Sequence, residues 1–205
     1  MKRLALVAAL AAACVASGPA KAAAQAVVGQ AAPAFTLTDS DGKSRSSADF
    51  GGKVIVLEWW SHECPFVAKH YGSGNMQKLQ EAWTGRGVAW LTINSSAPGK
   101  QGHVGAKAAN ALMKEKGGTP TAVLLDHDGK VGRAYGAKTT PHMFVIDSKG
   151  KVAYAGGIDD KPTTDLADIE TATNHVAVAL ADITAGRPVA VATSQPYGCS
   201  VKYAQ

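Results

Sequence analysis

Cys64 occupies a place in the sequence where a thiol is expected to be reactive. Residues 59–67 read Trp-Trp-Ser-His-Glu-Cys-Pro-Phe-Val, so an apolar run gives way to polar residues and then to a cysteine followed by Pro65. Proline is favoured in the first turn of a helix, which places Cys64 at a helix N-terminus. Unpaired N–H groups and the helix dipole there favour the thiolate, the nucleophilic form. The pattern predicts nucleophilic or redox chemistry, because a structural cysteine is expected within a strand or on an apolar helix face.

The residues just before Cys64 supply further groups that could act on a thiol. Ser61 and His62 are polar and lie within three positions of the cysteine, and we expect both to assist it, His62 as a polarising neighbour. Side chains alternate in direction along a strand, so one of Trp59 and Trp60 should enter the core while the other lines the cleft. We assign Trp60 to the cleft.

Cys199 is the second candidate for thiol chemistry. The chain has three cysteines, and Cys14 lies in an N-terminal segment with the features of a cleaved leader. Two cysteines in an oxidising compartment form either a structural disulfide or a redox pair. Residues 195–198 contain proline and glycine and could let Cys199 approach Cys64 to resolve an oxidised form of it. A bond between the two would stabilise the fold by about 4 to 5 kcal/mol, so a purely structural role stays open.

Histidines near Cys64 raise the alternative of metal binding. His62, Cys64 and His70 lie close together in the sequence, and thiolate with imidazole binds copper or zinc. Only one cysteine is local, so we predict no metal site. Thiol-based oxidoreduction needs no dissociable cofactor, and we expect its electrons to come from a partner thiol. The alternative function is a non-catalytic binding protein that holds copper or a client protein in the Cys64 cleft.

The rest of the sequence predicts an α/β domain that holds this segment. Residues 27–50 contain alternating residues and turn residues and indicate a β-hairpin. Residues 53–60 and 88–94 are apolar, as buried strands are, and a helix from Pro65 toward Trp83 would connect them as a βαβ unit. Further elements are expected downstream: a helix at 106–116, strands at 121–125, 143–147 and 152–156, and a closing helix at 169–185.

Two segments resemble the thioredoxin-like superfamily. Residues 59–67 are similar to the active-site turn of that superfamily, and residues 139–147 (TTPHMFVID) are similar to its cis-proline strand. The resemblance implies that Thr140 and Pro141 lie across from Cys64 and shape the groove for a partner. It also implies a thioredoxin-like α/β fold, in which a central mixed β-sheet is flanked by helices and the β-hairpin is an N-terminal extension.

Three further stretches narrow the resemblance to the redoxin (AhpC/TSA, peroxiredoxin-like) family. They are the Cys-Pro-Phe turn, residues 133–137 and residues 198–202. This family implies a thiol oxidoreductase acting on a thiol–disulfide partner protein or a peroxide. Val67 stands where a second, adjacent cysteine would be, and Pro141 stands where peroxiredoxins carry a catalytic arginine. Arg133 is the remaining candidate for that role.

The N-terminus predicts export. A basic start is followed by ten apolar residues at 4–13 and by small residues at 20–24, the order of a secretory signal peptide. We expect cleavage near residues 22–24 and a periplasmic or secreted protein, with lipid attachment at Cys14 as the alternative. No later segment has the roughly 20 apolar residues needed to cross a bilayer. The predicted organisation is a signal peptide (1–24), a thioredoxin-like redoxin domain (25–190) and a C-terminal tail (191–205).

The charge balance argues against nucleic-acid binding. The chain carries 21 Lys and Arg against 16 Asp and Glu, a net charge of +5. Removing residues 1–24 takes away three basic residues, which leaves 18 against 16 and a net charge of +2. No Lys/Arg cluster remains that could neutralise a series of phosphates.

Overall fold

The computed structural model of this chain describes residues 25–205. The predicted signal peptide and Cys14 therefore lie outside the described residues. The strands are β1 (Thr36–Asp39), β2 (Ser44–Ser46), β3 (Ile55–Trp59), β4 (Ala89–Asn94), β5 (Ala122–Leu125), β6 (Thr139–Thr140), β7 (His142–Ile146), β8 (Val152–Gly156) and β9 (Cys199–Ser200). The helices are α1 (Pro65–Gly72), α2 (Asn75–Thr84), α3 (Ala106–Glu115), α4 (Lys130–Tyr135) and α5 (His175–Thr184). Short 3₁₀ helices span Ser47–Phe50 and Leu166–Glu170.

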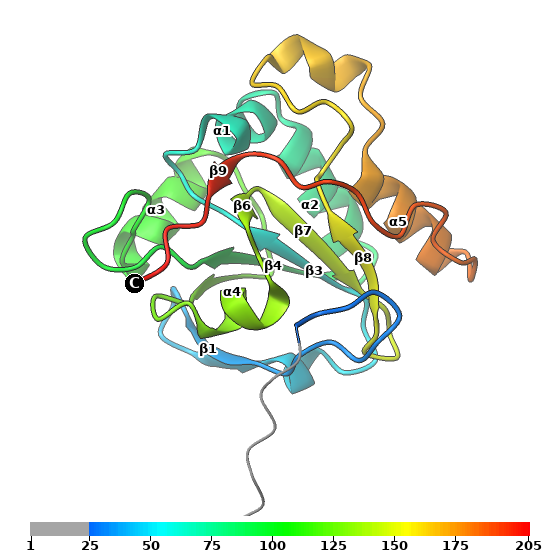
Figure 1. Cartoon of the computed structure of the whole chain (residues 1–205), viewed down its shortest axis with the longest axis horizontal. Helices are drawn as coiled ribbons and strands as arrows, with labels where there is room; N and C mark the ends of the chain where they lie inside the picture. The colour runs from blue at the N-terminus through cyan, green and yellow to red at the C-terminus, as the bar shows by residue number, and fades with distance from the viewer. Residues whose placement is uncertain (1–24) are drawn as a thin grey trace, which may run out of the picture.

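A seven-stranded mixed sheet forms the centre of the molecule (Figure 1). Its strand order is β2-β1-β5-β4-β3-β7-β8. Strands β3, β4 and β5 run parallel, as the predicted βαβ unit requires, whereas β7 and β8 add an antiparallel hairpin on one side. The predicted N-terminal hairpin is β1–β2, and it completes the sheet on the other side by pairing β1 antiparallel to β5. The α/β architecture with a central mixed sheet is thus confirmed.

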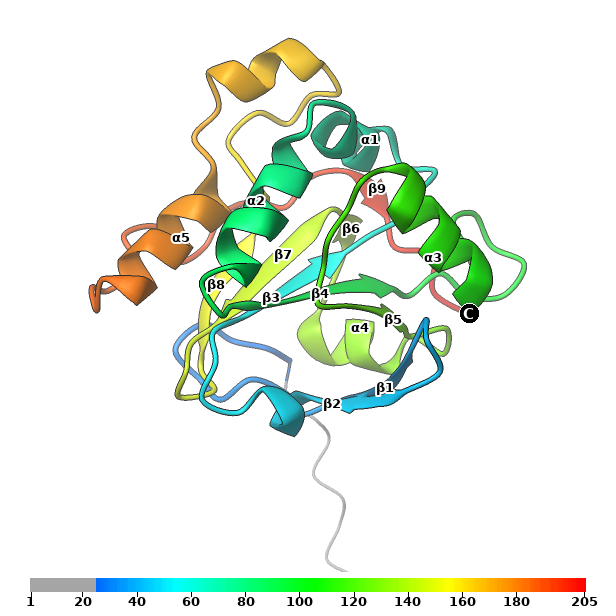
Figure 2. The ribbon, with the colours of Figure 1, turned by 180° about the vertical axis from the view of Figure 1, so that it is seen from behind.

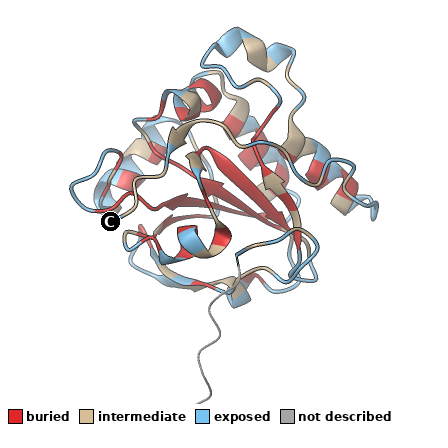
Figure 3. Ribbon diagram, viewed as in Figure 1, coloured by how far each residue is buried: buried red, intermediate tan, exposed pale blue. Residues whose placement is uncertain are grey.

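Side chains of β3 alternate between the two faces of the sheet, and helices cover both faces. Val56 belongs to a buried cluster with residues of α1, α2, α3 and α5. Leu57 and Trp59 belong to a second cluster that includes residues of α4 and of the N-terminal segment. Figures 1 and 2 show α1, α2, α3 and α5 on one side of the sheet and α4 on the other. Strands β3, β4 and β7 are buried along their whole length (Figure 3). Cys64 lies in the first cluster.

Three helical segments differ from the sequence expectation. The helix predicted from Pro65 toward Trp83 is two helices, because the chain breaks at Gly74, which has a φ of +75° that favours glycine. The helix predicted at 169–185 is a 3₁₀ turn followed by α5, whose N-terminus is capped by the side chain of Asn174. Helix α4 was not predicted. It is short, and the buried Asp126 carboxylate accepts the N–H groups of its first turn.

The C-terminal tail is packed against the domain along its length. It first runs beside β8, where the Ala155 N–H donates to the Ala192 carbonyl. It then adds β9 to β6 in a separate two-stranded sheet. Beyond β9, the Ala97 N–H donates to the Lys202 carbonyl at 2.9 Å. Figure 1 shows the tail in orange-red to red, crossing from α5 past β8 to the end near α3 and α4.

Within residues 25–205, no helix combines the length and apolar character needed to cross a membrane.

Candidate active site

Cys64 lies between the end of a buried strand and the start of a helix. Strand β3 ends at Trp59, and α1 begins at Pro65 with Cys64 as its N-cap residue. The backbone of Cys64 is extended (φ −85°, ψ 120°), which is usual for an N-cap residue, and Pro65 sets the first helical turn. The predicted strand–turn–helix context of the thiol is therefore present. The Cys64 side chain is almost fully buried, at 1% exposure.

Thr140 and Pro141 face Cys64 from the loop between β6 and β7. The Cys64 thiol donates a hydrogen bond to the Thr140 carbonyl at 2.8 Å. The peptide bond between Thr140 and Pro141 is cis, and both residues are buried. The position of these two residues across from the thiol is the one implied by the resemblance to the thioredoxin-like superfamily.

Cys199 reaches the same place from the C-terminal tail. It lies opposite Thr140 in the antiparallel β6–β9 pair, and the Thr140 hydroxyl oxygen is 3.5 Å from the Cys199 carbonyl oxygen. Both cysteines are free thiols. They line one cavity of about 10 Å³, which has room for about one water molecule. The tail therefore covers Cys64 and brings Cys199 next to it.

The two thiols have pKa values shifted in opposite directions. Burial alone would raise the pKa of Cys64, but hydrogen-bond donors outweigh it and lower the pKa below that of an ordinary thiol. These donors are the Thr140 hydroxyl, the Cys199 thiol, the Cys199 N–H and the N–H of Val67 in the first turn of α1. Burial and the neighbouring Cys64 raise the pKa of Cys199 to about 11. Cys64 is thus the thiol that ionises first.

Of the predicted polar helpers, Ser61 lies at the thiol and His62 does not. Ser61 is buried and lines the cavity that holds both cysteines. The His62 ring packs beside Trp60, with the ring centroids 5.9 Å apart, and lines a different hollow. The Glu63 carboxylate accepts the Gly102 N–H at 2.9 Å and is therefore directed toward the loop between β4 and α3.

Trp60 is buried in the same apolar cluster as Cys64, but it does not line the cavity between the cysteines. It lines a hollow of about 270 Å³ with His62, Val67, Tyr71 and part of Lys116. Trp59 enters the cluster on the opposite face of the sheet, so the expected alternation holds although both indoles are buried.

Arg133, the remaining candidate for the catalytic arginine of peroxiredoxins, lies away from Cys64 in the structure. The Arg133 guanidinium stacks on the Tyr203 ring, 4.6 Å from its centroid, and donates to the Ala204 carbonyl. It does not line the cysteine cavity. Among the described residues that line this cavity, Lys202 is the one with a cationic side chain. Arg133 is thus engaged by the end of the C-terminal tail and lies outside the lining of the cysteine cavity.

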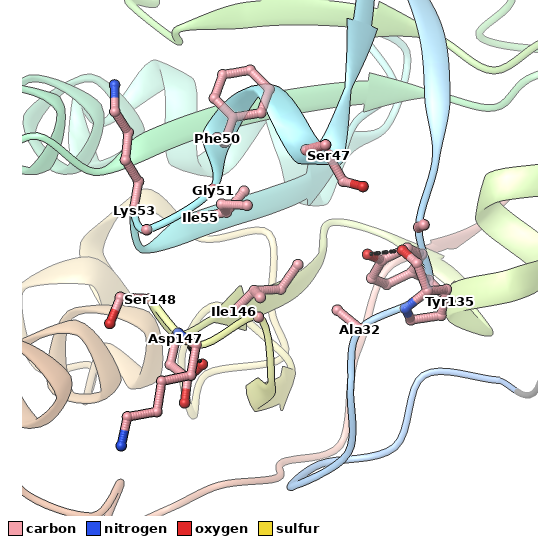
Figure 4. A pocket seen from close by; sticks show the side chains of 16 residues that line it. Ala32, Ser47, Phe50, Gly51, Lys53, Ile55, Tyr135, Ile146, Asp147 and Ser148 are labelled. Atoms are coloured by element: carbon pink, nitrogen blue, oxygen red, sulfur yellow. Dashed lines mark hydrogen bonds between the residues drawn. The ribbon is translucent and has the colours of Figure 1, made fainter.

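A larger hollow lies away from the cysteines, where β3 begins and β7 ends, near Ser47–Phe50 (Figure 4). Its volume is about 340 Å³, and Lys53, Ile146 and Tyr135 are among its lining residues. The Tyr135 hydroxyl donates to the Pro33 carbonyl there at 2.7 Å. No cysteine or histidine lines this hollow within the described residues.

Glu58 is a buried charged residue that the sequence analysis did not single out. Its side chain has no exposure, and burial raises its pKa above the ordinary value for glutamate. Four donors surround the carboxylate, from Tyr71, Gln80, Trp90 and Thr92. The signal was present in the sequence, because one acidic residue interrupts the apolar run of β3.

Copper or zinc ligands do not converge on Cys64 in the described part of the chain. No group of three or more His, Cys, Asp or Glu side chains in residues 25–205 is arranged to hold a metal ion. His70, one of the residues considered for such a site, is bound instead by Asn75 and Tyr197.

A family comparison places this architecture among known proteins. The Redoxin family model matches residues 27–191. The chain belongs to the Redoxin family. Thiol-disulfide oxidoreductase ResA of Geobacillus thermodenitrificans is 30% identical over 125 residues, which make up 61% of this chain and 66% of ResA. The alignment therefore spans just under two thirds of that relative's length.

Solved structures support the same Redoxin family fold. A hypothetical protein of Sinorhizobium meliloti superimposes with a TM-score of 0.72 at 26% identity, over 87% of this chain and 95% of its own. A protein proposed to be the thiol:disulfide interchange protein DsbE of Chlorobium tepidum is 24% identical and has a TM-score of 0.52, over 64% of this chain and 85% of its own. This second likeness shows the fold alone. The predicted thioredoxin-like fold and redoxin family are confirmed.

The Redoxin family match ends before Cys199. Residue 191 is the last one matched, so most of the C-terminal tail lies beyond the family comparison. Any role of Cys199 in this Redoxin family protein must therefore be argued from its own contacts with Thr140 and Cys64.

Proposed function

We propose that this protein is a thiol–disulfide oxidoreductase in which Cys64 is the nucleophile and Cys199 resolves the mixed disulfide. The name of its ResA relative supports the reaction class. The observation that carries the proposal is the placement of Cys199 beside Cys64 by the β6–β9 pair, with the lower pKa on Cys64. A nucleophile with a lowered pKa and a second thiol within reach are what disulfide exchange requires.

The first step uses the Cys64 thiolate. It attacks one sulfur of a partner's disulfide, so that a bond forms between Cys64 and the partner while the partner's own S–S bond breaks. The partner's other sulfur leaves as a thiolate and takes a proton from water. The donors around Cys64, above all the Thr140 hydroxyl, stabilise the attacking thiolate before the reaction.

The second step uses Cys199. After losing its proton to water, Cys199 attacks the Cys64 sulfur, the 64–199 bond forms and the mixed disulfide breaks. The partner's second sulfur leaves and is protonated. The partner has then gained two electrons and two protons, and the Cys64–Cys199 dithiol has become a disulfide. A thiol donor reverses the sequence and restores the dithiol.

Access to Cys64 requires movement of the C-terminal tail. The cavity at the two cysteines has a volume of about 10 Å³, too small for a polypeptide disulfide. Strand β9 pairs with one edge of β6. An extended segment of a partner could pair with that same edge if β9 moved away. We infer that a partner displaces β9 and that β9 returns when Cys199 attacks.

Peroxide is a less suitable oxidant for this site than a disulfide. Lys202 is the one cation among the residues that line the cysteine cavity, and Arg133 is held by Tyr203. A peroxide O–O bond is cleaved most readily where donors stabilise the leaving oxygen. We therefore propose a protein or peptide thiol–disulfide partner.

We further propose that the protein works outside the cytoplasm. This rests on the signal-peptide pattern of residues 1–24. N-terminal sequencing of protein recovered from the periplasm or medium should find a first residue near 23–25. A lipid-modified protein that begins at Cys14 would support membrane attachment instead, and an intact Met1 in the cytoplasm would exclude export.

The proposed reaction is tested with a peptide that contains one disulfide and with reduced glutathione as the electron donor. The wild-type protein should reduce the peptide over many turnovers. Cys64→Ser should be inactive. Reduced Cys199→Ser, mixed with the peptide in the absence of glutathione, should stop at a mixed disulfide between Cys64 and the peptide, detectable by mass spectrometry. Retention of turnover by Cys64→Ser would exclude the mechanism. Absence of any reaction in the wild type would favour a binding role for the cleft.

A further inference from the structure

A buried polar network joins four parts of the chain near the two cysteines. It connects α1, whose N-terminus carries Cys64, with the start of α2, the loop after β8 and the C-terminal tail. Its members are Lys69, His70, Asn75, Asp159 and Tyr197. Lys69, His70 and Asp159 are at most 3% exposed. Charged groups are seldom buried to this extent unless they are paired, so the network is a specific feature of the fold.

The hydrogen bonds of the network run in one direction, from Asn75 to Asp159. The Asn75 side-chain nitrogen lies 2.9 Å from His70 Nδ1, and because an amide nitrogen only donates, Nδ1 accepts. A neutral imidazole then carries its proton on Nε2, which lies 3.2 Å from the Tyr197 hydroxyl oxygen. The Tyr197 hydroxyl in turn donates to Asp159 Oδ1. Burial lowers the pKa of His70 to about 4, in keeping with the neutral form.

The carboxylate at the end of this chain is balanced by a buried lysine. Lys69 Nζ lies 3.8 Å from Asp159 Oδ2 and donates to the Lys161 carbonyl at 2.8 Å. Asp159 Oδ1 also accepts the Lys161 N–H at 2.9 Å. The Tyr197 hydroxyl is thus a donor to a desolvated carboxylate, and hydrogen bonds of this kind are about twice as strong as neutral ones.

The contacts of Tyr197 restrict the position of Cys199. It lies two residues before Cys199, and its ring packs edge-on against Phe66 in the first turn of α1, with 5.8 Å between the centroids. Gly198 between them passes so close to Thr140 that an added Cβ would lie 2.1 Å from the Thr140 carbonyl oxygen. The tail therefore has little freedom between the Tyr197 hydroxyl and the Cys199 sulfur.

We propose that Tyr197 is a positioning residue for disulfide exchange, held by Asp159 and His70 so that Cys199 is kept beside Cys64. This inference rests on the proposed function. Tyr197 does not touch the reacting sulfur atoms in this role. It raises the effective concentration of the Cys199 thiol at Cys64, which favours the internal disulfide over a mixed disulfide with another thiol.

The test compares Tyr197→Phe with the wild type and with Tyr135→Phe. Tyr197→Phe keeps the ring that packs on Phe66 and removes only the hydroxyl. Tyr135→Phe is the matched control, because the Tyr135 ring is also buried and its hydroxyl also makes a part-buried hydrogen bond, to the Pro33 carbonyl in the hollow away from the cysteines. Each protein is equilibrated in buffers of reduced and oxidised glutathione, and the fraction with a 64–199 disulfide is measured by mass spectrometry. Thermal unfolding of each reduced protein is recorded alongside.

The hydrogen bond to a buried carboxylate predicts the size of the effect. In Tyr197→Phe, the internal disulfide should be about 10-fold easier to reduce. Half of the protein should then be reduced at a ratio of [GSH]² to [GSSG] about 10-fold lower than in the wild type. The control should stay within about 2-fold of the wild type. Asp159→Asn, which removes the charge and keeps the shape, should shift the midpoint in the same direction as Tyr197→Phe.

Two results would overturn the inference, and they differ in what else they affect. An unchanged midpoint in Tyr197→Phe, with normal formation of the 64–199 disulfide, would show that Tyr197 does not position Cys199 and would leave the proposed function intact. Equal shifts in Tyr197→Phe and Tyr135→Phe that follow their loss of thermal stability would also reject a positioning role. Failure of the wild type to form a 64–199 disulfide in any buffer would instead reject the proposed function itself.

Discussion

Thr140 pairs with Cys199 across the β6–β9 ladder while its carbonyl oxygen accepts the Cys64 thiol at 2.8 Å. One residue therefore contacts both cysteines, although 76 positions separate Thr140 from Cys64 and 59 separate it from Cys199. This arrangement gives the two thiols different surroundings, and measurable differences follow from it.

The first prediction concerns the order in which the two thiols ionise. The pKa of Cys64 is lowered and that of Cys199 is raised, so alkylation of Cys64 should reach half its maximal rate at a lower pH than alkylation of Cys199. Mass spectrometry of the two labelled peptides across a pH series measures this. Cys199→Ala removes a donor to Cys64 and should move the Cys64 inflection to higher pH. Inflections in the reverse order would contradict the assignment of Cys64 as the nucleophile.

The second prediction concerns Gly198, which allows the tail to approach Thr140. Gly198 has a φ of +131°, and an alanine Cβ there would lie 2.1 Å from the Thr140 carbonyl oxygen. Gly198→Ala should displace β9, lower the unfolding free energy by about 2 kcal/mol and speed the labelling of Cys64.

Gly186→Ala is the matched control for Gly198→Ala. Gly186 also has a positive φ, of +70°, but an added Cβ meets nothing within 4 Å. It should lose some stability through backbone strain and leave Cys64 labelling unchanged. Equal labelling rates in the two variants would show that the tail does not cover Cys64 through this contact.

The third prediction concerns the buried carboxylate of Glu58. Glu58→Leu leaves the donors of Tyr71, Gln80, Trp90 and Thr92 without their acceptor and should lower the unfolding free energy by about 3 kcal/mol or more. Glu58→Gln keeps an acceptor oxygen of the same shape and should cost less. Urea denaturation at neutral pH compares the two. A leucine variant as stable as the glutamine variant would show that these hydrogen bonds contribute little.

The fourth prediction concerns stability in acid. His142 is buried against Phe144 and accepts the Lys138 N–H, and burial lowers its pKa to about 4. The unfolded chain, in which a histidine titrates near pH 6.5, therefore binds a proton before the folded protein does. This contribution is present above pH 6.5 and is lost as the pH falls toward 4, at about 1.4 kcal/mol per pH unit.

His142→Gln keeps an acceptor and removes that titration. Between pH 6.5 and 5, its unfolding free energy should fall by about 2 kcal/mol less than that of the wild type. Urea denaturation at several pH values gives both slopes. Parallel slopes would show that His142 is not held in its neutral form by the fold.

The local sequence was sufficient to predict the surroundings of Cys64. The apolar run before it and Pro65 after it indicated a strand, a turn and a helix, and these are β3 and α1. Hydrophobic periodicity depends on neighbours in the chain, so the strands of the central sheet were also predicted. His142 shows the limit of this reasoning: it directly follows Pro141, which faces Cys64, but its ring packs against Phe144, which belongs to the cluster on the other face of the sheet.

The position of Cys199 could not be predicted in this way, because it depends on contacts between distant residues. Ser194 fits against Gly156, where a side chain would collide with it, and the Tyr203 ring fits against Gly132 in the same manner. None of these contacts leaves a periodic pattern in the tail. The network of His70, Asp159 and Tyr197 is likewise assembled from three separate parts of the chain.

The most direct test of the account maps the disulfides that form when the reduced protein meets one equivalent of a small disulfide such as oxidised glutathione. Rapid acid quenching and peptide mass spectrometry would identify each sulfur linkage with time. A glutathione adduct should form on Cys64 first, followed by a 64–199 disulfide with release of both glutathione molecules. A first adduct on Cys199, or a Cys64 adduct that persists in the presence of an intact Cys199, would contradict the account.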